Sequence, residues 1–100
     1  MELEDIDLNL LVVFKHLLAE RSVSRVAQTL DLTQPAVSNA LARLRKLLGD
    51  ELFLRTPQGM EPTPFAEQLA DSVTYALGMI HGALNQSTSF DPEEIGRAHV

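Results

Sequence analysis

The chain has 100 residues, of which 45% are apolar and 22% charged, an ordinary globular composition with room for one domain. No apolar run approaches the roughly 18 residues that cross a bilayer, and the acidic start from Met1 to Asp7 lacks the basic region of a signal peptide. The absence of cysteine excludes disulfides and thiolate metal sites. We therefore expect a cytoplasmic protein that does not interact with membranes.

The net charge of −6 is unevenly distributed along the chain. Residues 21–59 carry six bases and three acids, a net charge of +3, whereas residues 1–20 and 60–100 carry −4 and −5. The six bases are Arg21, Arg25, Arg43, Arg45, Lys46 and Arg55. A basic middle segment can meet phosphate groups although the whole chain is acidic.

The first half of the chain reads as three helices. Apolar residues at helical spacing predict a helix over 8–20 behind the N-cap Asp7. Ser22 can cap a short second helix, which ends at a break at 31–33. We expect Asp31 to adopt the left-handed conformation that this turn requires.

The third helix is predicted from Thr33, an N-cap, to Gly49, a C-terminal stop. Pro35 falls in its first turn, where a missing N–H costs little. Together the second and third helices form a helix-turn-helix pattern, which on its own is only moderately specific because other helical hairpins imitate it.

The second half predicts a β-hairpin and a long helix. Residues 51–55 and 60–63 read as short strands joined by a turn with Pro and Gly at 56–59. The long helix should begin at Pro64 and reach about Asn85, with a linker from Gln86 onward.

Exposed polar side chains on the third helix suggest a DNA-reading surface. The amide and hydroxyl groups of Gln34, Ser38 and Asn39 suit base edges in a major groove. Arg43 and Lys46, farther along the helix, are better placed for phosphates. The alternative is an ordinary solvated helix face, with long charged side chains extending into water; we give Arg21 and Arg45 that interpretation.

The order of several sequence blocks resembles the N-terminal DNA-binding domains of LysR-type transcriptional regulators, over about residues 3–92. The matching blocks are Asp7–Phe14, Ser22–Ala27, Leu32–Ser38, Leu41–Leu44, Leu52–Arg55 and Gly59–Thr63. The residues of the first and last blocks are most similar to those of regulators of aromatic-compound degradation and of nodulation. The implied fold is mainly α, a winged helix-turn-helix with a short β-hairpin wing and a long C-terminal linker helix for dimerisation.

The resemblance, together with the exposed positions, implies two sets of DNA contacts. Base edges would be met by Gln34, Pro35, Ser38 and Asn39. The DNA backbone or minor groove would be met by Ser24, Thr33, Arg43, Lys46 and Arg55. Many family members carry Arg where this chain has Asn39, and an amide there favours adenine over guanine.

An apolar stripe along the long helix allows two interpretations. Its members are Phe65, Leu69, Val73, Leu77, Ile80 and Leu84. The stripe could pack back on the first helix as ordinary core, or it could form a homodimer. Because a helix of roughly 33 Å outreaches so small a body, we expect Leu77, Ile80 and Leu84 to stay exposed unless a second chain covers them.

The resemblance also predicts the domain organisation. Residues 1–63 would form the DNA-binding domain, 64–86 the linker and dimerisation helix, and 87–100 a hinge or tail toward an effector-binding domain absent from this chain. That domain would bind a small-molecule effector, with aromatic compounds as candidates, and full-length chains could form tetramers. This chain itself is expected to hold no cofactor.

Neither an enzyme nor a metal site is indicated. His16, His81 and His99 lie far apart without carboxylates at ligand spacing, and no phosphate-binding glycine loop or nucleophile–base pair is present. Two other functions remain open. One is a small winged-helix regulator of another family that is complete at this length, and the other is a helical protein-interaction module.

Overall fold

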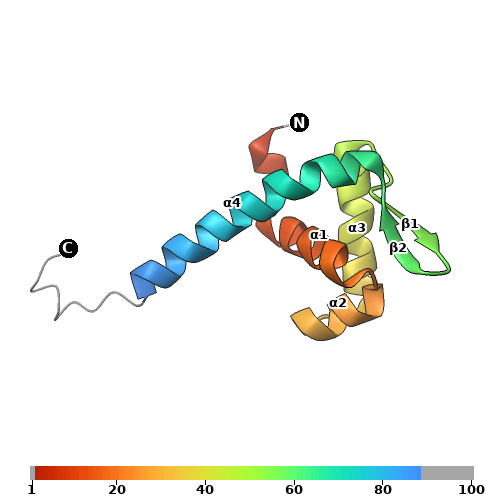
Figure 1. Cartoon of the computed structure of the whole chain (residues 1–100), viewed down its shortest axis with the longest axis horizontal. Coiled ribbons are helices and arrows are strands. Elements are labelled where there is room, and N and C mark those ends of the chain that lie inside the picture. The colour runs from red at the N-terminus through yellow and green to blue at the C-terminus, as the bar shows by residue number, and fades with distance from the viewer. Residues whose placement is uncertain (1, 89–100) are drawn as a thin grey trace, which may run out of the picture.

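The computed structural model describes residues 2–88 and shows a small helical body, a two-stranded wing and one long projecting helix (Figure 1). This confirms the predicted mainly α winged helix-turn-helix. A short 3-10 helix near the N-terminus was not predicted. The elements are η1 (Leu3–Asp5), α1 (Leu8–Glu20), α2 (Val23–Leu30), α3 (Gln34–Leu48), β1 (Phe53–Thr56), β2 (Gly59–Pro62) and α4 (Pro64–Thr88).

Side-chain caps begin the first three long helices at the predicted residues. The carboxylate of Asp7 accepts a hydrogen bond from the Asn9 N–H (2.9 Å), and the Ser22 hydroxyl accepts one from the Arg25 N–H (3.2 Å). The Thr33 hydroxyl does the same at the start of α3, with Ala36 as donor. Each cap satisfies an N–H that has no partner within its helix.

Left-handed residues end these helices. Arg21 (φ 57°) follows α1, Asp31 (φ 58°) follows α2 and Gly49 (φ 67°) follows α3. The conformation predicted for Asp31 is thus confirmed, as is the stop at Gly49. These sharp reversals set α2 and α3 against α1 as a three-helix body.

The core lies where α1, α3 and the start of the wing meet. Phe14 and Phe53 are fully buried, with their ring centroids 5.7 Å apart and tilted by 58°, an arrangement that aromatic pairs favour. The other large side chains that are fully buried are Leu17, Leu44, Leu52, Val26 and Val37. The core thereby joins the helix-turn-helix to the wing.

The wing is an antiparallel hairpin in which Phe53 pairs with Pro62 and Thr56 with Gly59. Its first strand begins two residues later than predicted, because Leu52 has a left-handed backbone (φ 66°) that breaks the extended chain. Such a conformation costs an L-residue roughly 1–2 kcal/mol. The second strand begins at Gly59, one residue earlier than predicted, so the turn is shorter.

The last helix, α4, begins at the buried cap Thr63. Its hydroxyl accepts a hydrogen bond from the Ala66 N–H (3.1 Å) and donates one to the Asp50 carboxylate (2.7 Å). The helix has 25 residues, a length of roughly 37 Å at 1.5 Å per residue. The linker predicted from Gln86 is wrong as far as Thr88, which is still helical, and residues 89–100 lie outside the described part.

Candidate nucleic-acid interface

The third helix, α3, presents one apolar and one polar face. Val37, Leu41 and Leu44 are buried in the core. The predicted contact residues Gln34, Pro35, Ser38, Asn39, Arg43 and Lys46 are all exposed. The polar face therefore remains available to a ligand without any change in the core.

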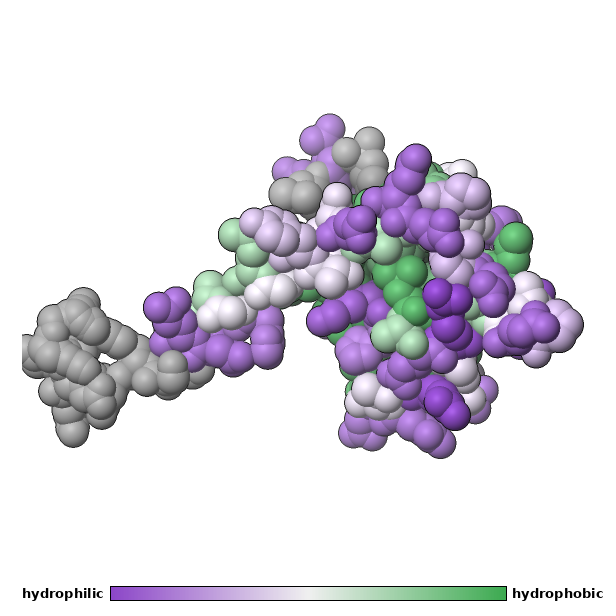
Figure 2. All heavy atoms as spheres, in the orientation of Figure 1, coloured by the Kyte–Doolittle hydropathy of each residue, from purple (hydrophilic) through white to green (hydrophobic). Residues whose placement is uncertain are grey.

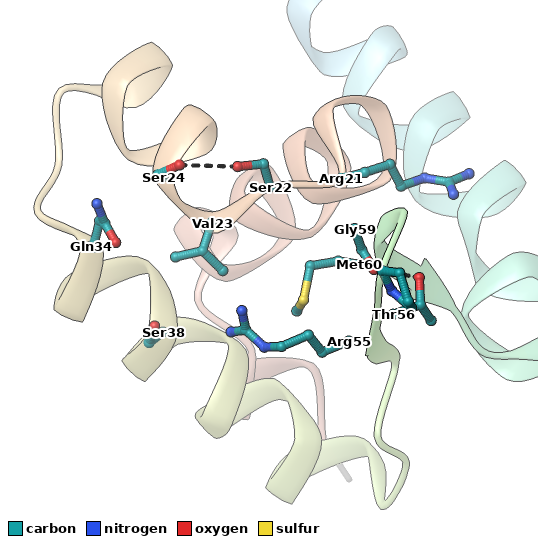
Figure 3. A pocket seen from close by; sticks show the side chains of 11 residues that line it. Arg21, Ser22, Val23, Ser24, Gln34, Ser38, Arg55, Thr56, Gly59 and Met60 are labelled. Atoms are coloured by element: carbon teal, nitrogen blue, oxygen red, sulfur yellow. Dashed lines mark hydrogen bonds between the residues drawn. The ribbon is translucent and has the colours of Figure 1, made fainter.

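A groove of about 330 Å³ lies between the starts of α2 and α3 and the wing (Figure 3). Its lining residues are Arg21, Ser22, Val23, Ser24, Gln34, Ser38, Arg55, Thr56, Pro57, Gly59 and Met60. None of them is acidic, although acids outnumber bases in the whole chain. The groove thus combines the Arg55 guanidinium with hydroxyl and amide groups, a set suited to phosphates and base edges, whereas the Arg21 guanidinium points away from it (Figure 3).

The position of Arg55 follows from strand alternation. Side chains two residues apart share one face of a strand, so Arg55 lies on the same face as the core residue Phe53, and it pairs across the hairpin with the buried Met60. Beyond the core its side chain extends toward Ser38 on α3 (Figure 3). Within residues 2–88 the Arg55 side chain has no hydrogen bond or ion pair, so all its donors are free.

The structure brings four of the nine predicted contact residues together in the groove, namely Ser24, Gln34, Ser38 and Arg55. The other five lie on or at the start of α3 outside the groove lining, namely Thr33, Pro35, Asn39, Arg43 and Lys46. The hydroxyl oxygen of Thr33 is engaged by the Ala36 N–H, but its own O–H can still donate to an anion.

Arg21 is not the freely solvated charge that was predicted. Its Nε donates to the Leu18 carbonyl (2.9 Å), and Nη1 lies 3.4 Å from a Glu61 carboxylate oxygen on the wing. Its backbone carbonyl accepts from the Met60 N–H (3.0 Å). At Gly59 a Cβ atom would lie only 2.9 Å from this carbonyl oxygen, so the wing can approach α1 this closely only with glycine there.

Arg45 was also predicted to be solvated, and the structure corrects this as well. Its guanidinium donates to the carbonyl oxygens of Glu51 (2.7 Å) and Phe53 (2.9 Å), at the base of the wing. No sequence pattern predicts these hydrogen bonds, because the position of an arginine on α3 does not indicate where a later strand will lie. Both arginines therefore hold the wing that carries Arg55.

A second exposed surface lies along α4. Val73 and Leu77 are buried (7% and 8% exposed), so the expectation that Leu77 stays exposed is wrong: α1 covers it. Ile80 and Leu84 are 43% and 59% exposed, as expected. A groove of about 370 Å³ between the two helices is lined by Leu8, Val12, Lys15, His16, Leu77, Ile80, His81 and Leu84.

Two further observations concern membrane-spanning helices and metal ligands. In residues 2–88 no helix is both long and apolar enough to span a bilayer. Over the same part of the chain, no three histidine, cysteine, aspartate or glutamate side chains are placed to hold a metal ion together.

Comparison with known proteins identifies the family. The model of the bacterial regulatory helix-turn-helix proteins of the lysR family matches residues 8–67. The chain belongs to the LysR family. The match covers α1 to the start of α4 and excludes the alternative of a winged-helix regulator from another family.

Individual LysR-family relatives are similar in sequence and fold. The HTH-type transcriptional activator NagR of Ralstonia sp. is 62% identical over 92 residues, covering 92% of this chain and 31% of NagR. The crystal structure of the probable transcriptional regulator PA0477 from Pseudomonas aeruginosa has a TM-score of 0.79 at 46% identity, covering 82% of this chain and 28% of that one. The chain thus spans about a third of the length of such relatives.

A third comparison concerns the fold alone. The BenM DNA-binding domain in its complex with catB site 1 DNA has a TM-score of 0.77 at 21% identity, covering 94% of this chain and 100% of that one. Because this chain covers the whole of that domain, the complete winged-helix arrangement, including the wing and the long helix, is shared.

Proposed function

We propose that this chain reads sequence in double-stranded DNA, as the DNA-binding part of a LysR-family transcription regulator. The observation that carries the proposal is the acid-free groove, in which the unpaired Arg55 guanidinium faces Gln34 and Ser38 on α3. The BenM DNA-binding domain has the same fold, and its structure was solved in a complex with DNA, which supports this assignment.

The two parts of the interface have different roles. The exposed face of α3 enters a major groove, where Gln34, Pro35, Ser38 and Asn39 meet base edges. Arg55 on the wing reaches the adjacent minor groove or its phosphates. The remaining contacts position the domain on the DNA backbone and come from Ser24, Thr33, Arg43 and Lys46.

A homodimer through α4 presents two such interfaces. From Ser72 to Thr88 this helix contains no Asp, Glu, Lys or Arg, and its colouring beyond the body runs from pale green to white before polar residues return at the end (Figure 2). A second copy can cover Ile80 and Leu84 without bringing like charges together. The dimer then binds an interrupted palindrome, and longer chains could pair dimers into tetramers.

The remaining assignments concern the whole regulator. Residues 1–63 act as the DNA-binding domain, and α4, which extends to Thr88, acts as the linker and dimerisation helix. Residues 89–100 lead toward an effector domain that binds a small molecule, and aromatic compounds are the first candidates to test. The regulator works in the cytoplasm and catalyses no reaction.

The test is fluorescence anisotropy of a labelled duplex carrying an interrupted palindrome, beside a scrambled duplex, across a salt series. Arg43, Lys46 and Arg55 supply three cations per chain. For a dimer, log affinity should fall against log salt with a slope of roughly −5. Preference for the palindrome with such a slope supports the proposal, whereas no binding at low salt would favour the protein-interaction module.

A further inference from the structure

Arg45 lies on the second half of α3 and contacts the wing. Its Nε donates to the Glu51 carbonyl and its Nη2 to the Phe53 carbonyl, and Nε also lies 3.6 Å from a Glu51 carboxylate oxygen. The side chain is 35% exposed, so it is only partly available to a ligand. Its Nε and Nη2 groups already donate within the protein, whereas Arg55 makes no such bond in residues 2–88.

The two carbonyls that Arg45 binds flank Leu52, the residue with the left-handed backbone. A branched apolar residue adopts this conformation only where its surroundings impose it. Here the Leu52 N–H donates to the Asp50 carboxylate (3.0 Å), and the Leu52 carbonyl accepts from the Thr63 N–H (2.9 Å). The guanidinium of Arg45 adds hydrogen bonds to the carbonyls on both sides of the bend.

The Phe53 carbonyl would otherwise be left on the open edge of the wing. In a two-stranded hairpin, alternate carbonyls of each strand point away from the partner strand and need another donor or water. The planar guanidinium of arginine offers several donors in a fixed fork and reaches two carbonyls at once. A lysine ammonium at this position has no such fork.

We propose that Arg45 is a positioning residue for the wing. It holds the bend at Leu52 and thereby the path of β1, so that Arg55 keeps its place opposite Ser38. Because Arg45 and Ser38 lie on the same helix, the wing moves with the base-reading face of α3. The inference rests on the proposed function only where DNA affinity is the measurement.

The DNA test uses a double-mutant cycle with the full 100-residue chain and the palindromic duplex. Arg45→Lys keeps the positive charge and most of the aliphatic stem but loses the forked guanidinium. Arg45→Met loses both the charge and the guanidinium. Each should weaken affinity about tenfold in the wild-type background, but less than about twofold when Arg55 is already alanine. Rescue by lysine, or additive losses, would overturn the proposal in favour of a direct phosphate contact.

A second measurement needs no DNA. In the folded Arg45→Lys variant, the heteronuclear NOE values of the wing amides at 54–61 should fall, while those of α3 at 36–41 stay unchanged. Unchanged wing amides would overturn the positioning role. If the wild-type chain binds no DNA, the proposed function fails while this measurement still decides the role of Arg45. Circular dichroism confirms that each variant is folded.

Discussion

The outer face of α3 and the far half of α4 are both exposed in the single chain, yet their chemistry is opposite. The first presents amide, hydroxyl and cationic groups, including Ser38 and Arg43. The second presents Ile80 and Leu84 on a stretch without formal charge apart from histidine. One surface suits a polar, anionic ligand and the other an apolar one.

The difference shows that exposure has different costs at the two surfaces. Polar groups in water are satisfied, so the face of α3 is stable without a ligand, whereas each exposed apolar Å² forgoes about 25 cal/mol of burial. The boundary on α4 is sharp. Leu77 is covered by α1, but α1 begins at Leu8, so the next residues of the stripe are covered on one side only.

Placing an acid on the polar face should have the largest effect. Ser38→Glu puts a carboxylate where base edges and phosphates arrive, and we expect a loss of DNA affinity of roughly 100-fold or more. The side chain is exposed, so the helical circular dichroism and the dimer mass should not change. Anisotropy titrations with the palindromic duplex measure the effect.

The matched control is Gln68→Glu, which adds the same charge at an exposed position on α4, outside the groove. It should weaken binding less than about threefold through net charge alone. Equal losses for the two variants would mean that the groove does not face the DNA.

Charging the apolar surface should have the next largest effect. Ile80→Glu and Leu84→Glu place carboxylates where a second α4 would pack, so the mass in solution should fall from twice 11.0 kDa to the monomer value. Affinity for two half-sites should drop roughly 10- to 100-fold, with little change for one half-site. Analytical ultracentrifugation and anisotropy report the two quantities.

Thr74→Glu, an exposed polar position on the same helix, is the control for added charge. It should leave the dimer intact. A wild-type chain that is monomeric at all concentrations, or a dimer that survives both glutamate variants, would place the dimer contact elsewhere.

Local signals made most of the fold predictable. Asp7, Ser22 and Thr33 are short polar residues directly before apolar periodicity, and each is an observed cap. The exposed contact residues on α3 were also predictable, because helical periodicity separates them from buried Val37 and Leu41.

The contacts that position the wing were not predictable, because Arg21 reaches Glu61 across 40 positions of the chain and Arg45 meets carbonyls whose direction is set by an unusual bend. The arginine fork of Arg45 depends on the bend at Leu52, and a positive φ at leucine contradicts its intrinsic preference. The burial of Leu77 likewise depends on where α4 crosses α1. Local sequence specifies the helices, whereas these long-range contacts set how they meet.

The smallest effect is expected from two glycine substitutions that separate backbone strain from close packing. Both Gly49 (φ 67°) and Gly59 (φ 118°) have left-handed backbones, but a Cβ at Gly49 meets nothing within 4 Å, whereas at Gly59 it meets the Arg21 carbonyl oxygen at 2.9 Å. Gly49→Ala should therefore cost roughly 1–2 kcal/mol of unfolding free energy from strain alone.

Gly59→Ala should cost more, because the strain of roughly 1–3 kcal/mol is joined by displacement of the wing from Arg21. Thermal unfolding by circular dichroism measures both, at about 4–8 °C per kcal/mol for a chain of this size. Only Gly59→Ala should also weaken DNA binding, since only it moves the strand pair that carries Arg55. Equal DNA affinities for the two folded variants would mean that the approach of the wing to α1 does not determine where Arg55 lies.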